Sequence, residues 1–182
     1  YLNLSNEWKR SIFGMRHYVM EMKNPNPERI LKAKNDNAID GIIIKSDIGE
    51  YGMGTAQEIR DAISDLRSSG KKAICYMEMV GNKEYYVASA CNKIFLNNAG
   101  YLNLYGLRSE FTSYKGLLDK LGIDADLYRI GKYKSATEML TDETMSDAHR
   151  ESLSFVLDDL HNQMINGIAD NRKVSTVKVQ EW

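Results

Sequence analysis

Hydrophobic positions along the chain alternate between two patterns, one typical of buried strands and one typical of helices. Continuous apolar runs occupy residues 42–44 and 73–77, as in strands that are covered on both faces. Helical spacing of apolar residues follows each run, over 55–69 and 83–91. This order of strand, helix, strand, helix predicts an α/β fold in which a mostly parallel sheet has helices on both faces.

The first third of the chain adds two predicted helices. Roughly helical spacing over residues 1–24 indicates a helix, with apolar positions at Ile12, Phe13, Met15, Tyr18, Val19 and Met22. Asn26 and Pro27 open a second, short helix, because asparagine caps exposed amides and proline at the first helical position loses no useful donor. This helix continues through Ile30, Leu31 and Ala33.

A glycine-rich turn follows the first buried strand, at Gly49, Gly52 and Gly54. Thr55 and Glu58 match a capping box, which predicts the start of the next helix. Its buried face carries Ala56, Ile59, Ala62, Ile63 and Leu66. Gly70 is expected to end this helix.

The second half of the chain predicts short strands at 93–96, 101–104 and 125–130. A helix between them carries Phe111, Tyr114, Leu117, Leu118 and Leu121, and Gly122 closes it. The longest helix spans about 146–170, with Leu153, Val156, Leu157, Leu160, Met164 and Ile168 at helical spacing. No repeat or linker interrupts this order, so residues 1–182 are interpreted as a single α/β domain.

Composition narrows the possible functions. The 182 residues carry 24 Lys and Arg against 25 Asp and Glu, interleaved along the chain, which argues against nucleic-acid binding. No apolar run approaches the roughly 18 to 20 residues of a membrane span. Cys75 and Cys91 lack a CxxC partner, so both are expected to be buried thiols.

Common catalytic and cofactor motifs are absent: no Walker loop, GxGxxG, GxSxG or HExxH sequence occurs. The histidines His17, His149 and His161 are too far apart along the chain to suggest a shared metal, and we expect neither a metal nor a cofactor. The glycines at 49, 52 and 54 fit either a tight turn or a nest of backbone amides for an anion.

The most informative segment is 131–136, which reads Gly-Lys-Tyr-Lys-Ser-Ala and follows a predicted strand. Loops at strand ends are where α/β proteins place ligands and catalytic groups. Taken alone, however, its two lysines are better explained as ordinary surface charge.

Together with four other blocks, this segment resembles the signal peptide peptidase A family of Ser/Lys proteases. The blocks are 39–44, 59–63 leading to 69–72, 84–89, 114–122 and 131–136, in the family's order. The resemblance covers about residues 39–171 and implies a fold like that of crotonase and the Clp proteases.

The resemblance places the general base of that family on Lys134. Only a neutral amine takes a proton from a serine hydroxyl, and a lysine ordinarily titrates near ~10.4, so burial or a cationic neighbour such as Lys132 must favour the neutral form. Gly131 and Ser135 are possible supporting residues, and Ser135 is expected to orient Lys134 through its hydroxyl.

Two departures from the family's short form stand out. Asn82 occupies the place of the nucleophilic serine before Tyr85 and Tyr86. The adjacent glycine pair of the oxyanion hole is also missing, and the separated Gly49 and Gly52 stand in its place as possible supporting residues. Both departures match the first half of the family's long form, which supplies the lysine while a second half supplies the serine. The chain is therefore expected to be a fragment of a two-half protein, with neither Ser89 nor Ser135 as nucleophile.

By this resemblance, the whole enzyme would degrade cleaved signal peptides or other apolar peptides at the outer, periplasmic face of the bacterial cytoplasmic membrane. A segment outside this chain would anchor it, and copies would assemble as a ring or dome. Two alternatives stay open: a non-catalytic scaffold or peptide-binding domain, and, by fold analogy alone, an acyl-CoA enzyme of the crotonase type.

Overall fold

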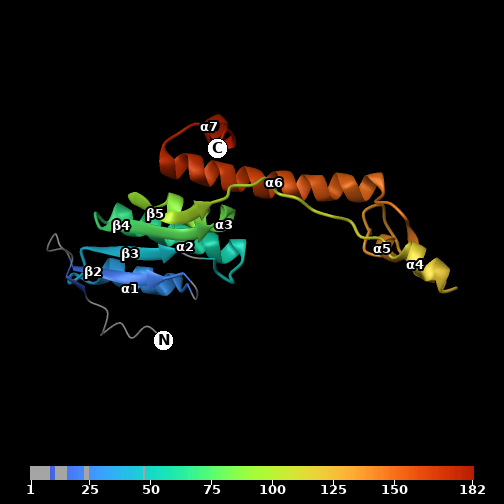
Figure 1. Ribbon diagram of the computed structural model, residues 1–182, viewed down its shortest axis with the longest axis horizontal. Helices are drawn as coiled ribbons and strands as arrows, with labels where there is room; N and C mark the ends of the chain where they lie inside the picture. The colour runs from blue at the N-terminus through green and yellow to red at the C-terminus, as the bar shows by residue number, and fades with distance from the viewer. Residues whose placement is uncertain (1–8, 11–15, 23–24, 47) are drawn as a thin grey trace. The chain divides into compact units, whose positions relative to one another are not determined.

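The computed structural model describes residues 9–10, 16–22, 25–46 and 48–182. The chain divides into two compact units (Figure 1). Unit 1 comprises Tyr1–Tyr105 and Met164–Trp182, and unit 2 comprises Gly106–Gln163. The single domain inferred from the sequence stays a prediction.

Unit 1 is built on a five-stranded sheet whose strands follow one another in chain order. These strands are β1 (Lys9–Arg10), β2 (Arg16–Glu21), β3 (Gly41–Ser46), β4 (Lys72–Val80) and β5 (Lys93–Leu102). Strands β2 to β5 are parallel, and β1 pairs antiparallel with β2. The predicted α/β class with a mostly parallel sheet is confirmed.

Three helices connect the parallel strands: α1 (Pro27–Asn35), α2 (Met53–Ser68) and α3 (Asn82–Ser89). Right-handed crossovers that advance in one direction across a sheet place their helices on one face. In agreement, the sheet residues that are buried in one core with these helices share a parity, namely Tyr18, Met20, Ile42, Ile44, Ala73, Cys75 and Met77. Side chains of the other parity, such as Val19 and Ile43, are only partly buried. The helices expected on the second face of the sheet stay a prediction.

The helix predicted for residues 1–24 is wrong where the chain is described, because 16–21 forms β2. Burial there has a period of two, with Tyr18, Met20 and Met22 buried while Val19 is half-buried and Glu21 exposed. The sequence of such a short apolar segment fits both a helical period and a strand period of two. Pairing with β3 selects the strand. The predicted helical positions Ile12, Phe13 and Met15 lie outside the described residues.

Helix boundaries follow the sequence signals in part. Asn26 caps α1 by accepting a 2.8 Å hydrogen bond from the amide of Glu28, with Pro27 as the first helical residue, as predicted. Helix α2 starts earlier than predicted, at Met53 after Gly52, without a side-chain cap, so the capping box expected at Thr55 is wrong. The predicted core face of α2 is buried, and Gly70 follows the helix with φ of +89°.

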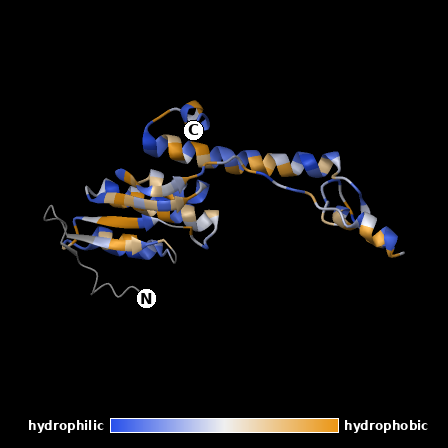
Figure 2. Cartoon of the chain, in the orientation of Figure 1, coloured by the Kyte–Doolittle hydropathy of each residue, from blue (hydrophilic) through white to orange (hydrophobic). Residues whose placement is uncertain are grey.

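The two short strands predicted at 93–96 and 101–104 are one strand, β5, whose pairing with β4 shifts register between Met77 and Met79. The long final helix is confirmed as α6 (Asp147–Arg172), and α7 (Thr176–Gln180) follows it. Polar and apolar residues alternate along α6 (Figure 2). None of the described helices has the length and apolar character needed to cross a membrane.

Unit 2 holds α4 (Lys115–Lys120), α5 (Glu138–Thr141) and the first part of α6. Gly122, with φ of +67°, closes α4 as predicted, although the helix begins only after Tyr114. The strand predicted at 125–130 is wrong, because this segment is irregular and no described strand pairs with it. Its apolar side chains Leu127, Tyr128 and Ile130 are exposed.

Candidate functional site

Unit 1 contains an open groove of about 590 Å³ at the carboxyl ends of β3 and β4. This edge of a parallel sheet is where α/β proteins place their ligands. The groove is lined by Ile48, Tyr51, Gly52, Met53, Val80, Gly81, Asn82, Lys83, Glu84, Tyr101, Asn103 and Tyr105. It brings the predicted Gly52 together with Asn82, the position that the family resemblance assigns to serine.

Lys83 holds the glycine turn that borders this groove. Its Nζ donates hydrogen bonds to the backbone oxygens of Gly49, at 2.6 Å, and Tyr51, at 2.8 Å. It also lies 4.3 Å from the centre of the Tyr51 ring. A side chain at Gly49 would collide with the backbone oxygen of Met22, so this glycine serves the tight turn; the anion nest stays a prediction.

Glu84 is a buried carboxylate in the wall of the groove. Its Oε2 accepts a hydrogen bond from the amide of Gly81, and its Oε1 lies 3.6 Å from the Nζ of Lys83. Burial raises the pKa of Tyr51, and the nearby charge of Glu84 raises it further, so the Tyr51 phenol stays neutral at physiological pH. The groove therefore combines apolar walls with one internally paired cation and anion.

Both polar atoms of the Asn82 side chain are already engaged. Nδ2 donates to the backbone oxygen of Tyr105 at 2.7 Å, and Oδ1 accepts from the amide of Tyr105 at 2.8 Å. Asn82 thus fixes the segment that follows β5 at Tyr105. Its amide offers no hydroxyl for acyl transfer. Its role in this groove is structural.

Replacing Asn82 by aspartate is therefore expected to lower the free energy of unfolding by about 1–2 kcal/mol, because the backbone oxygen of Tyr105 would face a second acceptor. The favourable position of a carboxylate at the start of α3 offsets part of this loss. Chemical denaturation measures the difference. Asn92→Asp is the matched control, since the Oδ1 of Asn92 accepts a bond from the amide of Ala73 that aspartate preserves. Equal stability of the two variants would contradict the structural role.

Unit 2 contains the lysine segment, residues 131–136. Gly131 has φ of +104°, and its backbone oxygen accepts a hydrogen bond from the amide of Lys134 at 3.2 Å, which makes a turn. The side chain of Lys134 is exposed and that of Ser135 is half-buried. Within the described chain, no hydrogen bond joins the Ser135 hydroxyl to Lys134, so the predicted orienting contact is not formed here.

Lys132 does not act as a free cation beside Lys134. Its Nζ lies 3.0 Å from Oε2 of Glu151 and 3.1 Å from the hydroxyl of Tyr133. These hydrogen bonds raise the pKa of Lys132, and the bond from Lys132 lowers the pKa of Glu151. The charge of Lys132 is therefore balanced by Glu151 of α6, which argues against the prediction that Lys132 favours a neutral Lys134.

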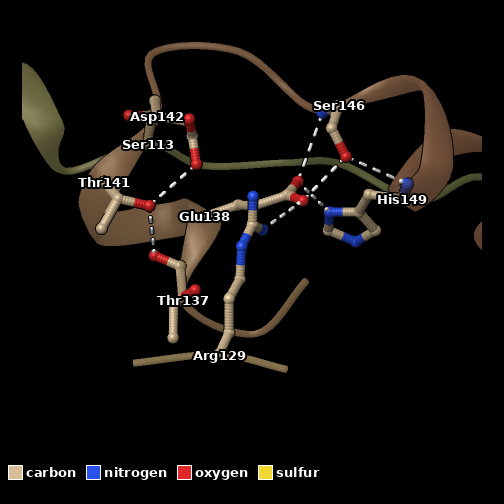
Figure 3. A network of polar contacts seen from close by, with 8 residues as sticks. All are labelled: Ser113, Arg129, Thr137, Glu138, Thr141, Asp142, Ser146 and His149. Atoms are coloured by element: carbon tan, nitrogen blue, oxygen red, sulfur yellow. Dashed lines mark hydrogen bonds and ion pairs between the residues drawn. The ribbon is translucent and has the colours of Figure 1, made fainter. Parts of the chain in front are cut away.

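Glu138 is a functional candidate that the sequence did not indicate. Its carboxylate is 1% exposed and accepts hydrogen bonds from Arg129, from the amide and hydroxyl of Ser146, and at 3.1 Å from Nδ1 of His149 (Figure 3). Burial alone would raise the pKa of Glu138, but these hydrogen bonds outweigh it and lower the pKa to about 2. Glu138 is thus an anion throughout the physiological range.

The groups around Glu138 do not form a hydrolytic triad, although they include a serine and a histidine. In a triad the histidine ring bridges the serine hydroxyl and the carboxylate. Here the Ser146 hydroxyl donates directly to Glu138 at 2.7 Å, and the ring of His149 also contacts Glu138. A carboxylate with a pKa of about 2 is a weak base, so Ser146 is not activated.

The remaining candidate groups have packing roles. Ser89 is buried and donates to the backbone oxygen of Tyr86 at 2.7 Å, as expected for a residue in helix packing. Cys75 and Cys91 are buried free thiols, as predicted, and the contact with Cys91 together with burial raises the pKa of Cys75. Among the described residues, no three His, Cys, Asp or Glu side chains are grouped as metal ligands.

Comparison with known proteins matches residues 65–182 to Peptidase family S49. The chain is 36% identical over 143 residues to the chloroplastic serine protease SPPA of Arabidopsis thaliana, covering 79% of the chain and 21% of that protein. It is 34% identical over 149 residues to Protease 4 of Salmonella typhi, covering 80% and 24%. A putative signal peptide peptidase SppA of Enterococcus faecium is 20% identical over 178 residues, covering 97% and 49%. The chain thus spans at most about half the length of these relatives.

Proposed function

The chain belongs to Peptidase family S49, the signal peptide peptidase A family, and from this premise we propose that it is the lysine-bearing part of a Ser/Lys endopeptidase. In this proposal Lys134 is the general base, and the nucleophilic serine comes from another segment or from a neighbouring subunit. The observation that carries the proposal is the side chain of Asn82, whose Nδ2 and Oδ1 are each hydrogen-bonded to the backbone of Tyr105 where the resemblance calls for a serine.

The surroundings of Ser89, Ser146 and Ser135 support a nucleophile outside this chain. The hydroxyl of Ser89 is buried and bonded to the backbone of Tyr86, and that of Ser146 is bonded to a weakly basic carboxylate. Ser135 lies next to Lys134 in sequence without a hydrogen bond to it among the described residues. Within the described parts of the chain, none of the three has a base placed to remove its proton.

The exposure of Lys134 supports a site that is completed by other parts of the protein. A general base must be uncharged, and enclosure away from water favours an uncharged amine. Because Lys134 is exposed in this chain, we propose that the segment or subunit that supplies the serine also covers this lysine. A ring or dome of copies would provide such a cover.

The proposed substrates are apolar peptides, including cleaved signal peptides. One relative bears the name signal peptide peptidase, and the groove of unit 1 has apolar walls that include Ile48, Met53 and Val80. We place the enzyme at the outer face of the bacterial cytoplasmic membrane, anchored through a segment outside residues 1–182. In the alternative function, this groove only binds peptides and the chain is a non-catalytic scaffold; the engaged Asn82 fits that reading too.

Labelling of the full-length protein with a serine-directed fluorophosphonate tests where the nucleophile lies. We expect the protein to hydrolyse a fluorogenic apolar peptide, and peptide mapping by mass spectrometry to find the label outside residues 1–182. Heat-denatured protein is the control for nonspecific labelling. A label on Ser135 or Ser146 that appears in step with loss of activity would contradict the proposed division of the site.

A further inference from the structure

The segment between Arg129 and Glu138 carries Lys134 but has little structure of its own. Its internal backbone bonds are two turns, from the amide of Lys134 to Gly131 and from the amide of Glu138 to Ser135. The side chains from residue 130 to 134 are exposed. A segment with so few buried contacts has low local stability, so its geometry depends on how its ends are held.

The two ends of the segment are joined to each other. Nη1 of Arg129 donates to Oε1 of Glu138 at 2.9 Å, across nine positions of the chain. Exposed ion pairs contribute little, but here the carboxylate partner is 1% exposed and fixed by further hydrogen bonds. The pair therefore closes residues 130–137 into a loop whose two ends are held together.

The ion pair that closes this loop is hydrogen-bonded to the start of α6. The amide of Ser146 donates to Oε2 of Glu138 at 3.2 Å, and the hydroxyl of Ser146 donates to Oε1 at 2.7 Å. The same hydroxyl accepts from the amide of His149, as an N-cap does. Together with Arg129 and the ring of His149, these donors fill the four acceptor positions of the carboxylate (Figure 3).

Helix α5, which carries Glu138, is fixed on another side as well. The amide of Tyr114 donates to the backbone oxygen of Met139 at 2.7 Å, and the hydroxyl of Ser113 donates to that of Asp142 at 2.6 Å. The ring of His149 also packs edge-on against Phe111, with 5.6 Å between ring centres. The position of Glu138 is thus fixed by contacts with residues next to α4 and by contacts with α6.

We propose that Glu138, through its ion pair with Arg129, is a positioning residue that holds the Lys134 segment in place against the start of α6. This inference rests on the proposed role of Lys134 as base. A base displaced by about 1 Å can lose roughly 10²-fold in rate, so a device that fixes the segment would act on turnover more than on substrate binding. Glu138 and Arg129 themselves do not touch the substrate in this proposal.

Arg129→Met in the full-length protein is the sharpest test, because it frees one end of the segment while Glu138 keeps its bonds to Ser146 and His149. We expect kcat to fall by about 10²-fold with KM within about twofold, and the melting temperature to stay nearly unchanged. Arg129→Lys retains the charge and should recover most of the rate. The exposed Glu143 provides the control, since Glu143→Gln removes a carboxylate of unit 2 outside this network and should behave like wild type.

Amide hydrogen exchange gives a readout that does not depend on activity. Arg129→Met and Glu138→Gln should each speed exchange at residues 132–137 by at least about tenfold relative to wild type and Glu143→Gln. Unchanged exchange and unchanged kcat in folded Arg129→Met would overturn the positioning role, even if Lys134→Ala is inactive. Faster exchange combined with a fully active Lys134→Ala would overturn the proposed function and leave Glu138 as the residue that orders this segment.

Discussion

Lys134→Ala in the full-length protein is expected to lower kcat/KM for an apolar peptide by about 10²–10⁴-fold, the range for removal of a general base. The loss should appear in kcat, because the proposed role of the amine is to take the proton of the serine in the chemical step and not to bind the peptide. Lys134→Arg should be equally inactive, since a guanidinium stays protonated and cannot accept that proton. Initial rates with a fluorogenic peptide measure both variants.

Lys132→Ala is the matched control for this experiment. Lys132 lies two residues away, and its charge is paired with Glu151 and held against Tyr133, so its loss should change kcat/KM by only a few-fold. Circular dichroism confirms that each variant is folded. Wild-type turnover by Lys134→Ala would mean that this part of the protein is a scaffold or a peptide-binding domain, and the proposal of a general base would be abandoned.

Elements defined by local pattern were predictable from the sequence. The continuous branched run that became β3 and the helical spacing of the apolar face of α2 are each bounded by glycines, and these local features specify their type. The segment that became β2 was not predictable, because its helical spacing competes with a period of two and only pairing with β3 decides. The prediction of a strand at 125–130 is wrong because no described strand lies beside this segment. Without a partner strand, its backbone groups would stay unpaired in an extended conformation.

The candidate site was predictable to a similar, partial extent. The family resemblance singles out Lys134 and the replacement of serine by Asn82, because both depend on residue identity in a motif. It could not show that the Asn82 amide is engaged by Tyr105, a residue 23 positions away. Glu138 was missed altogether, since one glutamate in a polar segment gives no sign of burial. A cap-like serine eight residues later was the one available signal.

Gly167→Val is expected to lower the free energy of unfolding by about 2–3 kcal/mol, the cost of overpacking a tight contact. A Cβ at this position of α6 would lie 2.6 Å from Cε2 of Tyr86 and 3.3 Å from Cζ of Arg60. Tyr86 cannot easily yield, because its ring is buried and its hydroxyl accepts a 3.0 Å bond from Arg60. The helix must therefore move away from α3, which strains the packing of Met164, Ile165 and Ile168. Urea denaturation of wild type and variant measures the loss.

Gly54→Val separates this contact from the general effect of replacing a helical glycine. Gly54 lies in the first turn of α2 with open space where its Cβ would be, so valine there should change stability by no more than about 0.5 kcal/mol. A double-mutant cycle then identifies the contact: in a Tyr86→Leu background, which removes the ring, Gly167→Val should cost less than half as much. An unchanged cost in that background would show that the ring of Tyr86 is not what requires glycine, and that α6 approaches α3 closely for another reason.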